Sequence, residues 1–179
     1  MASPVVEKLG QIITKQTAAS PDHARALLMA AYSWVNLAGR FPRPRNVRAA
    51  TERVNGGIAG TIVDSFRHPE NAVMVNIFMP CEILHAMELT PMFPEGISAY
   101  VANTACDEVF VETSESHDIA ETFCSYHKLM IGVAETGIMP RPLMIANTTL
   151  ACDANQLSFP RLAKFYDCLL YTSDAADDK

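Results

Sequence analysis

The stretch that decides the fold runs from residue 72 to residue 78 and reads AVMVNIF. It is too short for a buried helix and rich in β-forming residues, so it predicts a buried strand of a parallel sheet. A second short apolar stretch, residues 142–147 (PLMIAN), predicts another strand over residues 143–147. Helical patterns follow both stretches, and this alternation is typical of a parallel α/β sheet. We therefore expect a three-layer α/β/α fold with both strands parallel in one sheet.

Upstream of this stretch, residues 1–66 predict a helical lead-in. The first two helices begin at Ser3-Pro4 and Ser20-Pro21, with serine as the N-cap and proline at the first helical position. A third helix is expected over residues 47–66. Downstream, further helices are expected from Pro80, over residues 97–111 and 119–133, and from about Ser158. The lead-in carries no pattern of residues with obvious chemistry.

The end of the chain differs from the rest. Residues 168–179 read CLLYTSDAADDK and resemble translated sequencing-adapter tails. A helical pattern that reaches Tyr166 breaks there into a small acidic segment without a cap or periodicity. We expect residues 168–179 to be a non-native tail without packed contacts, and the alternative is an ordinary frayed C-terminus. On this interpretation the α/β region, residues 67–167, is incomplete and Cys168 has no function.

The composition excludes several classes of protein. The chain has 179 residues with a formal charge of −6, and 49% of them are apolar, which is enough for a core and excludes a disordered chain. An acidic balance without a basic run argues against nucleic acid or an anionic membrane as a partner. The sequence contains no bilayer-spanning apolar run, signal peptide or Gly-rich phosphate loop. We expect a cytoplasmic protein whose five cysteines are thiols or metal ligands rather than disulfides.

Residues with useful chemistry follow the two predicted strands. Cys81 and Glu82 come after the first strand, and Cys152 and Asp153 come after the second. Ligands bind at the carboxyl edge of open α/β sheets, where helix N-termini favour thiolates and other anions. Cys124 lies in or beside the helix between the strands, so it and Cys152 can converge on one site. Each cysteine has the alternative of being a small buried hydrophobe.

Three stretches carry a resemblance to a known family. They are residues 77–86 (IFMPCEILHA), residues 123–132 (FCSYHKLMIG) and residues 147–159 (NTTLACDANQLSF). In this order and approximate spacing they resemble the benzoyl-CoA reductase / 2-hydroxyacyl-CoA dehydratase family, in particular its D-component type. The likeness extends over about residues 72–166.

The resemblance implies an iron–sulfur site. Subunits of this family bind a 4Fe–4S cluster through three cysteines and leave one iron open to a non-protein ligand. By residue-by-residue correspondence, Cys124 and Cys152 would be the first two ligands, and the third is expected beyond this fragment. Glu82 is the matching carboxylate at the strand edge, so it is the candidate for acid/base chemistry or contact with the substrate hydroxyl. Neither Cys106 nor Cys168 falls in a matching context.

The resemblance also implies a reaction and partners. The expected reaction is dehydration of a 2-hydroxyacyl-CoA, or reduction of an aromatic acyl-CoA ring. One electron added to the thioester carbonyl gives a ketyl radical that expels the α-hydroxyl and makes the β-proton acidic. The electron would come from an ATP-dependent iron–sulfur activator protein, and a second homologous subunit would complete the enzyme. The fragment alone is expected to be inactive.

Other interpretations remain open at this point. The chain could be a homologue without dehydratase activity that serves electron transfer or assembly. It could be an enzyme with a cysteine nucleophile, because Cys124 and His127 lie three residues apart on one helical face. It could also be a non-catalytic α/β interaction domain with buried cysteines. A brown colour after anaerobic purification would distinguish an iron–sulfur protein from the last two.

Overall fold

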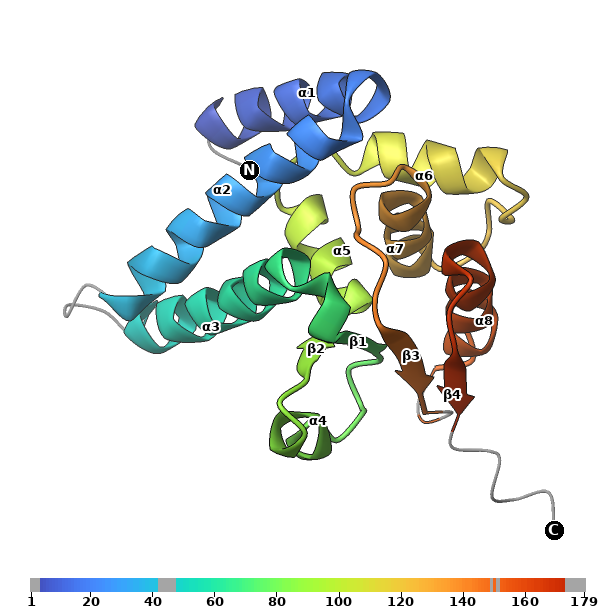
Figure 1. The fold of residues 1–179 in the computed structure, drawn as a ribbon. Coiled ribbons are helices and arrows are strands. Elements are labelled where there is room, and N and C mark those ends of the chain that lie inside the picture. Colours follow the sequence, from blue (N-terminus) through green and yellow to red (C-terminus); the bar gives the residue numbers. More distant parts are fainter. Residues whose placement is uncertain (1–3, 42–47, 149, 151, 173–179) are drawn as a thin grey trace, which may run out of the picture.

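The computed structural model describes residues 4–41, 48–148, 150 and 152–172. It begins with three helices: α1 (Pro4–Ala19), α2 (Pro21–Arg40) and α3 (Arg48–Arg67). A single 3₁₀ turn, η1 (Pro69–Asn71), leads into the sheet. The remaining elements are β1 (Ala72–Val75), α4 (Glu82–Ala86), β2 (Thr90–Met92), α5 (Pro94–Ala102), α6 (Glu108–Ser116), α7 (Ser125–Glu135), β3 (Met144–Asn147), α8 (Asn155–Tyr166) and β4 (Leu170–Thr172). Figure 1 shows their arrangement.

The described strands form one parallel sheet in the order β2-β1-β3-β4. β1 and β3 are neighbours, with Val73 opposite Met144, which confirms that the two predicted strands are parallel partners. β1 ends earlier than predicted, at Val75, because the chain then turns and the Met79 N–H bonds the Asn76 carbonyl. The strands are short, and all four residues of β1 are buried.

The two faces of the sheet pack against different layers. Ala72 and Met74 belong to the main hydrophobic core, which also contains side chains of α1–α3 and α5–α8. The alternate residues Val73 and Val75 belong to a smaller cluster with Leu84 of α4. Because successive side chains of a strand point to opposite faces, the sheet lies between two helical layers. This is the predicted three-layer α/β/α fold, and Figure 1 shows α4 set apart from the other helices.

The helical region is joined to the α/β region by packing and hydrogen bonds. The main core contains Ile13 of α1, Leu28 of α2 and Val63 of α3 together with Ile145 of β3. Arg25 of α2 donates from Nε to the Ile138 carbonyl at 2.6 Å and from Nη2 to the Gly137 carbonyl. The predicted boundary near residue 66 therefore marks a change of architecture within one shared core.

Several predicted helices have different bounds. Residues 97–111 form the end of α5 and the start of α6, separated by a turn in which Ala105 has a φ of +52°. The helix predicted over residues 119–133 begins only at Ser125, and the one predicted from about Ser158 begins at Asn155. β2 was not predicted, because it has three residues and Pro91 is the middle one. Ser20 is the N-cap of α2 and Pro21 its first residue, as predicted, but the Ser20 side chain makes no capping hydrogen bond. Ser3 and residue 47 lie outside the described residues.

The prediction that the tail makes no packed contacts is wrong for residues 168–172. β4 pairs with β3 along its open edge, and the Ile145 N–H bonds the Leu169 carbonyl at 2.8 Å. Leu170 and Cys168 pack against the main core, whereas Leu169 and Tyr171 stay exposed. The physical reason is that a Leu-Tyr-Thr segment has β propensity and lies next to an unpaired strand edge. Residues 173–179 lie outside the described residues, and the non-native origin of the tail stays a prediction.

Candidate functional site at the carboxyl edge of the sheet

The site lies where the strand order reverses. From β1 the chain continues to β2 on one side, and later to β3 and β4 on the other side. The connection through α4 packs on one face, and the connections through α5–α8 pack on the opposite face. A crevice therefore opens between the carboxyl ends of β1 and β3, which is where ligands bind in open α/β sheets.

A buried polar clamp fixes the carboxyl ends of these two strands. Asn76, directly after β1, donates from Nδ2 to the carbonyl and to the hydroxyl oxygen of Thr148, at 3.0 and 2.9 Å. The Thr148 hydroxyl lies 3.2 Å from Asn76 Oδ1, to which it donates. Both side chains are buried, so their mutual bonds satisfy groups that water does not reach. The clamp holds the two loops that follow the strands in a fixed relation.

Beside the clamp is a pocket of about 370 Å³. Its lining comes from the segment after β1 and from the N-terminal parts of α5, α7 and α8. The lining residues are Ile77, Phe78, Glu95, Gly96, Ala99, Cys124, Tyr126, His127, Cys152 and Asn155. Ile77, Phe78 and Tyr126 are each about half exposed, so the pocket has an apolar rim.

Helix N-termini converge on this pocket. α5 begins one residue before Glu95, α7 begins directly after its N-cap Cys124, and α8 begins at Asn155. The first N–H groups of a helix have no partner within the helix and carry partial positive charge. These helix dipoles act in favour of negative charge at the pocket, such as a thiolate or an anionic ligand, whereas burial acts against it.

The structure brings Cys124 and Cys152 to the lining of this one pocket. The Cys124 thiol is exposed and the Cys152 thiol is half-buried, and neither is in a disulfide. Among the described residues, no three His, Cys, Asp or Glu side chains are grouped as a metal site. The pocket thus offers a pair of thiols rather than a full set of protein ligands.

His127 bonds Cys152 rather than Cys124. The hydroxyl of Ser158 donates to the Ala154 carbonyl at 2.9 Å, so it accepts at 2.8 Å from Nδ1–H of His127. This assignment leaves Nε2 as an acceptor, 3.6 Å from the Cys152 sulfur. Burial lowers the pKa of His127, which keeps the ring neutral at pH 7. The geometry therefore does not support the pairing of Cys124 and His127 considered for a nucleophilic enzyme.

Glu95 and Asn155 are pocket residues that the sequence did not reveal. Burial raises the pKa of Glu95 to about 7, although the N–H groups of Glu95 and Ile77 act in the opposite direction. Oε2 of Glu95 is buried with no hydrogen-bond partner among the described residues. The same holds for Oδ1 of Asn155, a residue with 1% exposure. The available signal was the Pro94-Glu95 helix start, which marks a first-turn carboxylate but not its burial.

The structure does not bring Glu82 to this pocket. Glu82 is exposed on α4, the helix that packs on the opposite face of the sheet. Its neighbour Cys81 packs in the smaller cluster and donates from Sγ to the Met79 carbonyl at 3.2 Å. Cys106 is buried in the main core, with its sulfur 3.2 Å from the Thr104 hydroxyl. Of the three predicted site residues, the two cysteines line one pocket and the glutamate lies elsewhere.

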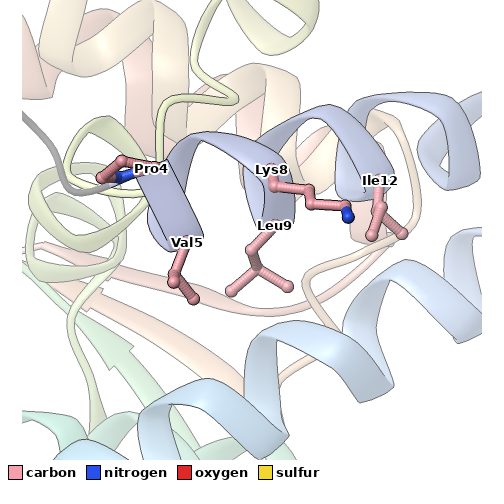
Figure 2. Close-up of a pocket in the computed structure, with 5 residues that line it drawn as sticks. All are labelled: Pro4, Val5, Lys8, Leu9 and Ile12. Atoms are coloured by element: carbon pink, nitrogen blue, oxygen red, sulfur yellow. The ribbon is translucent and has the colours of Figure 1, made fainter.

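Other hollows lie in the helical region and carry less chemistry. Figure 2 shows one along α1, where Val5, Leu9 and Ile12 form an apolar strip beside Lys8. A larger one, about 630 Å³, is lined by residues that include Tyr32, Trp34 and Tyr100. The described linings of these two hollows contain no cysteine, histidine or carboxylate. The pocket at the sheet edge, whose lining includes two cysteines, a histidine and a carboxylate, is therefore the candidate functional site.

Comparison with known protein families gives a match over the α/β region. The family model described as 2-hydroxyglutaryl-CoA dehydratase, D-component, matches residues 76–177. The match covers more than half of the chain and includes every lining residue of the sheet-edge pocket. Comparison with curated proteins gave no match.

Proposed function

The chain belongs to the 2-hydroxyglutaryl-CoA dehydratase D-component family, and from this premise we propose that it is the iron–sulfur subunit of a 2-hydroxyacyl-CoA dehydratase. The observation that carries the proposal is that Cys124 and Cys152 line one pocket at the topological switch point of the sheet. Because the family match is to a dehydratase component, we favour dehydration over ring reduction.

The residues present fit a 4Fe–4S cluster. Iron–sulfur clusters are held by cysteine thiolates, and the pocket supplies two thiols beside helix N-termini that favour negative charge. Cys124 and Cys152 would hold the cluster, together with a third cysteine from elsewhere in the protein. A bound cluster with one open iron would supply a binding position and a single electron for the thioester.

The other pocket residues would bind the substrate and exclude water. The rim of Ile77, Phe78 and Tyr126 gives an apolar contact for the acyl group of an acyl-CoA. The helix N-termini would stabilise negative charge that develops on the thioester oxygen. His127 holds its proton on Nδ1 through Ser158, so its Nε2 accepts from Cys152 only while that residue is a protonated thiol, and this bond is given up when Cys152 becomes a thiolate ligand.

The partners in the proposal follow from the reaction. The substrate is an acyl-CoA, a second homologous subunit completes the enzyme, and an ATP-dependent iron–sulfur activator protein supplies the electron. In the described part of the chain, no helix combines the length and apolarity that crossing a bilayer requires. Glu82 lies outside the pocket, so we give it no role there.

Substitution of the two pocket cysteines tests the proposal. The full-length protein with its partner subunit, purified without oxygen, should be brown. Cys124→Ser and Cys152→Ser should each lose most of the iron and acid-labile sulfide, because both thiols are needed as ligands. Cys81→Ser and Cys106→Ser are matched controls outside the pocket and should keep the wild-type iron content.

Circular dichroism of all four variants verifies that iron is not lost through unfolding. Wild-type iron content in both Cys124→Ser and Cys152→Ser would contradict the proposal. A brown wild-type protein that does not turn over a 2-hydroxyacyl-CoA with its activator would instead identify a homologue for electron transfer or assembly.

A further inference from the structure

Two buried oxygen atoms in the sheet-edge pocket have no hydrogen-bond partner among the described residues. Oε2 of Glu95 comes from the first turn of α5, and Oδ1 of Asn155 comes from the start of α8. Neither atom has a hydrogen-bond partner within the described part of the chain. An unpaired buried polar group costs roughly 1–3 kcal/mol, so native proteins rarely leave one without a purpose. Because both residues line the same pocket, a ligand there can satisfy both oxygens.

The chemistry of the two groups identifies the kind of ligand atom. The amide oxygen of Asn155 can only accept a hydrogen bond. Because its pKa is raised to about 7, Glu95 is protonated in a large fraction of molecules at neutral pH and can then donate one. A hydroxyl group donates and accepts, so it satisfies both residues at once. A carbonyl or phosphate oxygen only accepts and would leave Asn155 unpaired.

Building on the proposed function, we propose that Glu95 and Asn155 form the subsite for the α-hydroxyl of the 2-hydroxyacyl-CoA substrate. The hydroxyl donates to Oδ1 of Asn155 and accepts from the protonated carboxyl of Glu95. Glu95 then acts as the acid in the loss of water. Asn155 holds the departing oxygen in reach of that acid.

The proton transfers balance as follows. The substrate first receives one electron from the ATP-dependent iron–sulfur activator, and the same iron–sulfur system takes this electron back after the β-proton has been removed. When the bond between Cα and the hydroxyl oxygen breaks, its electron pair stays on oxygen and the Glu95 proton moves to that oxygen, so water departs. The resulting Glu95 carboxylate takes the β-proton, whose C–H electron pair stays on the substrate and forms the double bond. Glu95 is protonated again at the end of the cycle.

Binding to the resting protein tests the subsite without turnover. The full-length protein with its partner subunit is titrated calorimetrically with 2-hydroxyglutaryl-CoA and with glutaryl-CoA, which lacks only the α-hydroxyl. The wild-type protein should bind the hydroxylated ligand about tenfold more tightly, as expected for two neutral hydrogen bonds. Asn155→Leu should remove most of this preference. Glu108→Gln, another first-turn glutamate but exposed on α6, should keep it.

A second, isosteric variant separates proton donation from binding. Glu95→Gln should still bind both ligands and keep the wild-type iron content, but its kcat should fall by about 10²–10⁴-fold because an amide cannot supply the proton. Equal binding of the two ligands by an iron-loaded, active wild-type protein would overturn the subsite, as would full kcat in Glu95→Gln. A wild-type protein without iron or turnover would overturn the proposed function, and the subsite with it.

Discussion

The carboxyl of Glu95 couples the stability of the fold to pH. Its ordinary pKa is 4.5 and burial raises it to about 7, so the folded chain holds this proton more tightly than the unfolded chain. The resulting stabilisation is fully present below about pH 4.5 and is lost as the pH rises through about 7. His127 acts in the opposite direction, because its lowered pKa makes stability rise with pH up to its ordinary value of 6.5.

Glu95→Gln should therefore change the pH dependence of unfolding. Relative to wild type, the variant should gain free energy of unfolding between pH 5 and pH 8, by up to about 3 kcal/mol, because one pKa unit corresponds to about 1.4 kcal/mol. Urea denaturation over this pH range measures the gain, and the difference between the two proteins removes the contribution of His127. Glu108→Gln is the control and should follow wild type. A difference between Glu95→Gln and wild type that does not vary with pH would contradict the assignment.

At the level of single residues, the two pocket cysteines could be predicted from the sequence, but the other residues that line the pocket could not. Cys124 and Cys152 could be singled out because one precedes a helix and the other follows a predicted strand. Glu95 and Asn155 matter through burial and missing partners, which arise only when α5 and α8 approach the same crevice. The local sequence around Glu95 and Asn155 does not indicate that α5 and α8 approach each other in this way.

Among the elements, α6 and α7 pack unusually closely. A Cβ atom placed on Gly132 of α7 would overlap the backbone carbonyl of Phe110 in α6. Backbone atoms cannot move aside as a flexible side chain can, so the two helices would have to separate. α7 carries Cys124 at its N-cap, and the spacing of these helices therefore affects the position of the pocket.

Gly132→Ala should lower the free energy of unfolding by roughly 2–4 kcal/mol, as overpacking against a rigid neighbour does. Gly57→Ala is the matched control in α3, since a methyl group there would meet no described atom outside the local helix within 4 Å. It should raise stability by about 0.5–1 kcal/mol through helix propensity. Chemical denaturation measures both variants, and equal effects would contradict the close packing.

The prediction of strands and helices succeeded where a segment has a distinctive composition. It failed where a turn depends on tertiary contacts rather than on the local sequence. The apolar run before Asn76 is typical of a buried strand, and β1 lies within it. The break between α5 and α6 falls at Ala105, whose left-handed φ gives no signal in the sequence. β2 contains Pro91, a residue that argues against a strand unless the strand lies at an edge, as β2 does.

For the whole molecule, Arg25 links the helical region to the α/β region. Its guanidinium donates to the carbonyls of Gly137 and Ile138, and Ile138 is fully buried. It also forms an ion pair with Asp22 at 3.2 Å, but the Asp22 side chain is 88% exposed. The carbonyl bonds therefore contribute more to stability than the ion pair does.

Arg25→Ala should lower the free energy of unfolding by about 1.5–3 kcal/mol, because it leaves carbonyls without their charged donor. Asp22→Asn removes only the exposed ion pair and should cost no more than about 1 kcal/mol. Thermal or urea unfolding of both variants gives the comparison. Equal losses in the two variants would show that the link does not depend on the carbonyl bonds.

The class of fold and the family were accessible from sequence, because they depend on the order of strand, helix and motif along the chain. The pairing of β4 with β3 could not be predicted from the sequence, because it depends on the unpaired edge of β3 lying next to this segment in the fold. For Leu170, this contact with β3 and the core outweighs the absence of any helical or capping signal in its own segment.

The clamp between Asn76 and Thr148 also bears on the order in which the chain is synthesised and folds. β1 is synthesised well before β3, so Asn76 is already part of the chain before its hydrogen-bond partner Thr148 has been added. Pairings between segments so distant in sequence form late in folding. During that interval Cys124 has been synthesised and Cys152 has not. A ligand that needs both Cys124 and Cys152 can therefore bind only after the second of these two residues has been synthesised.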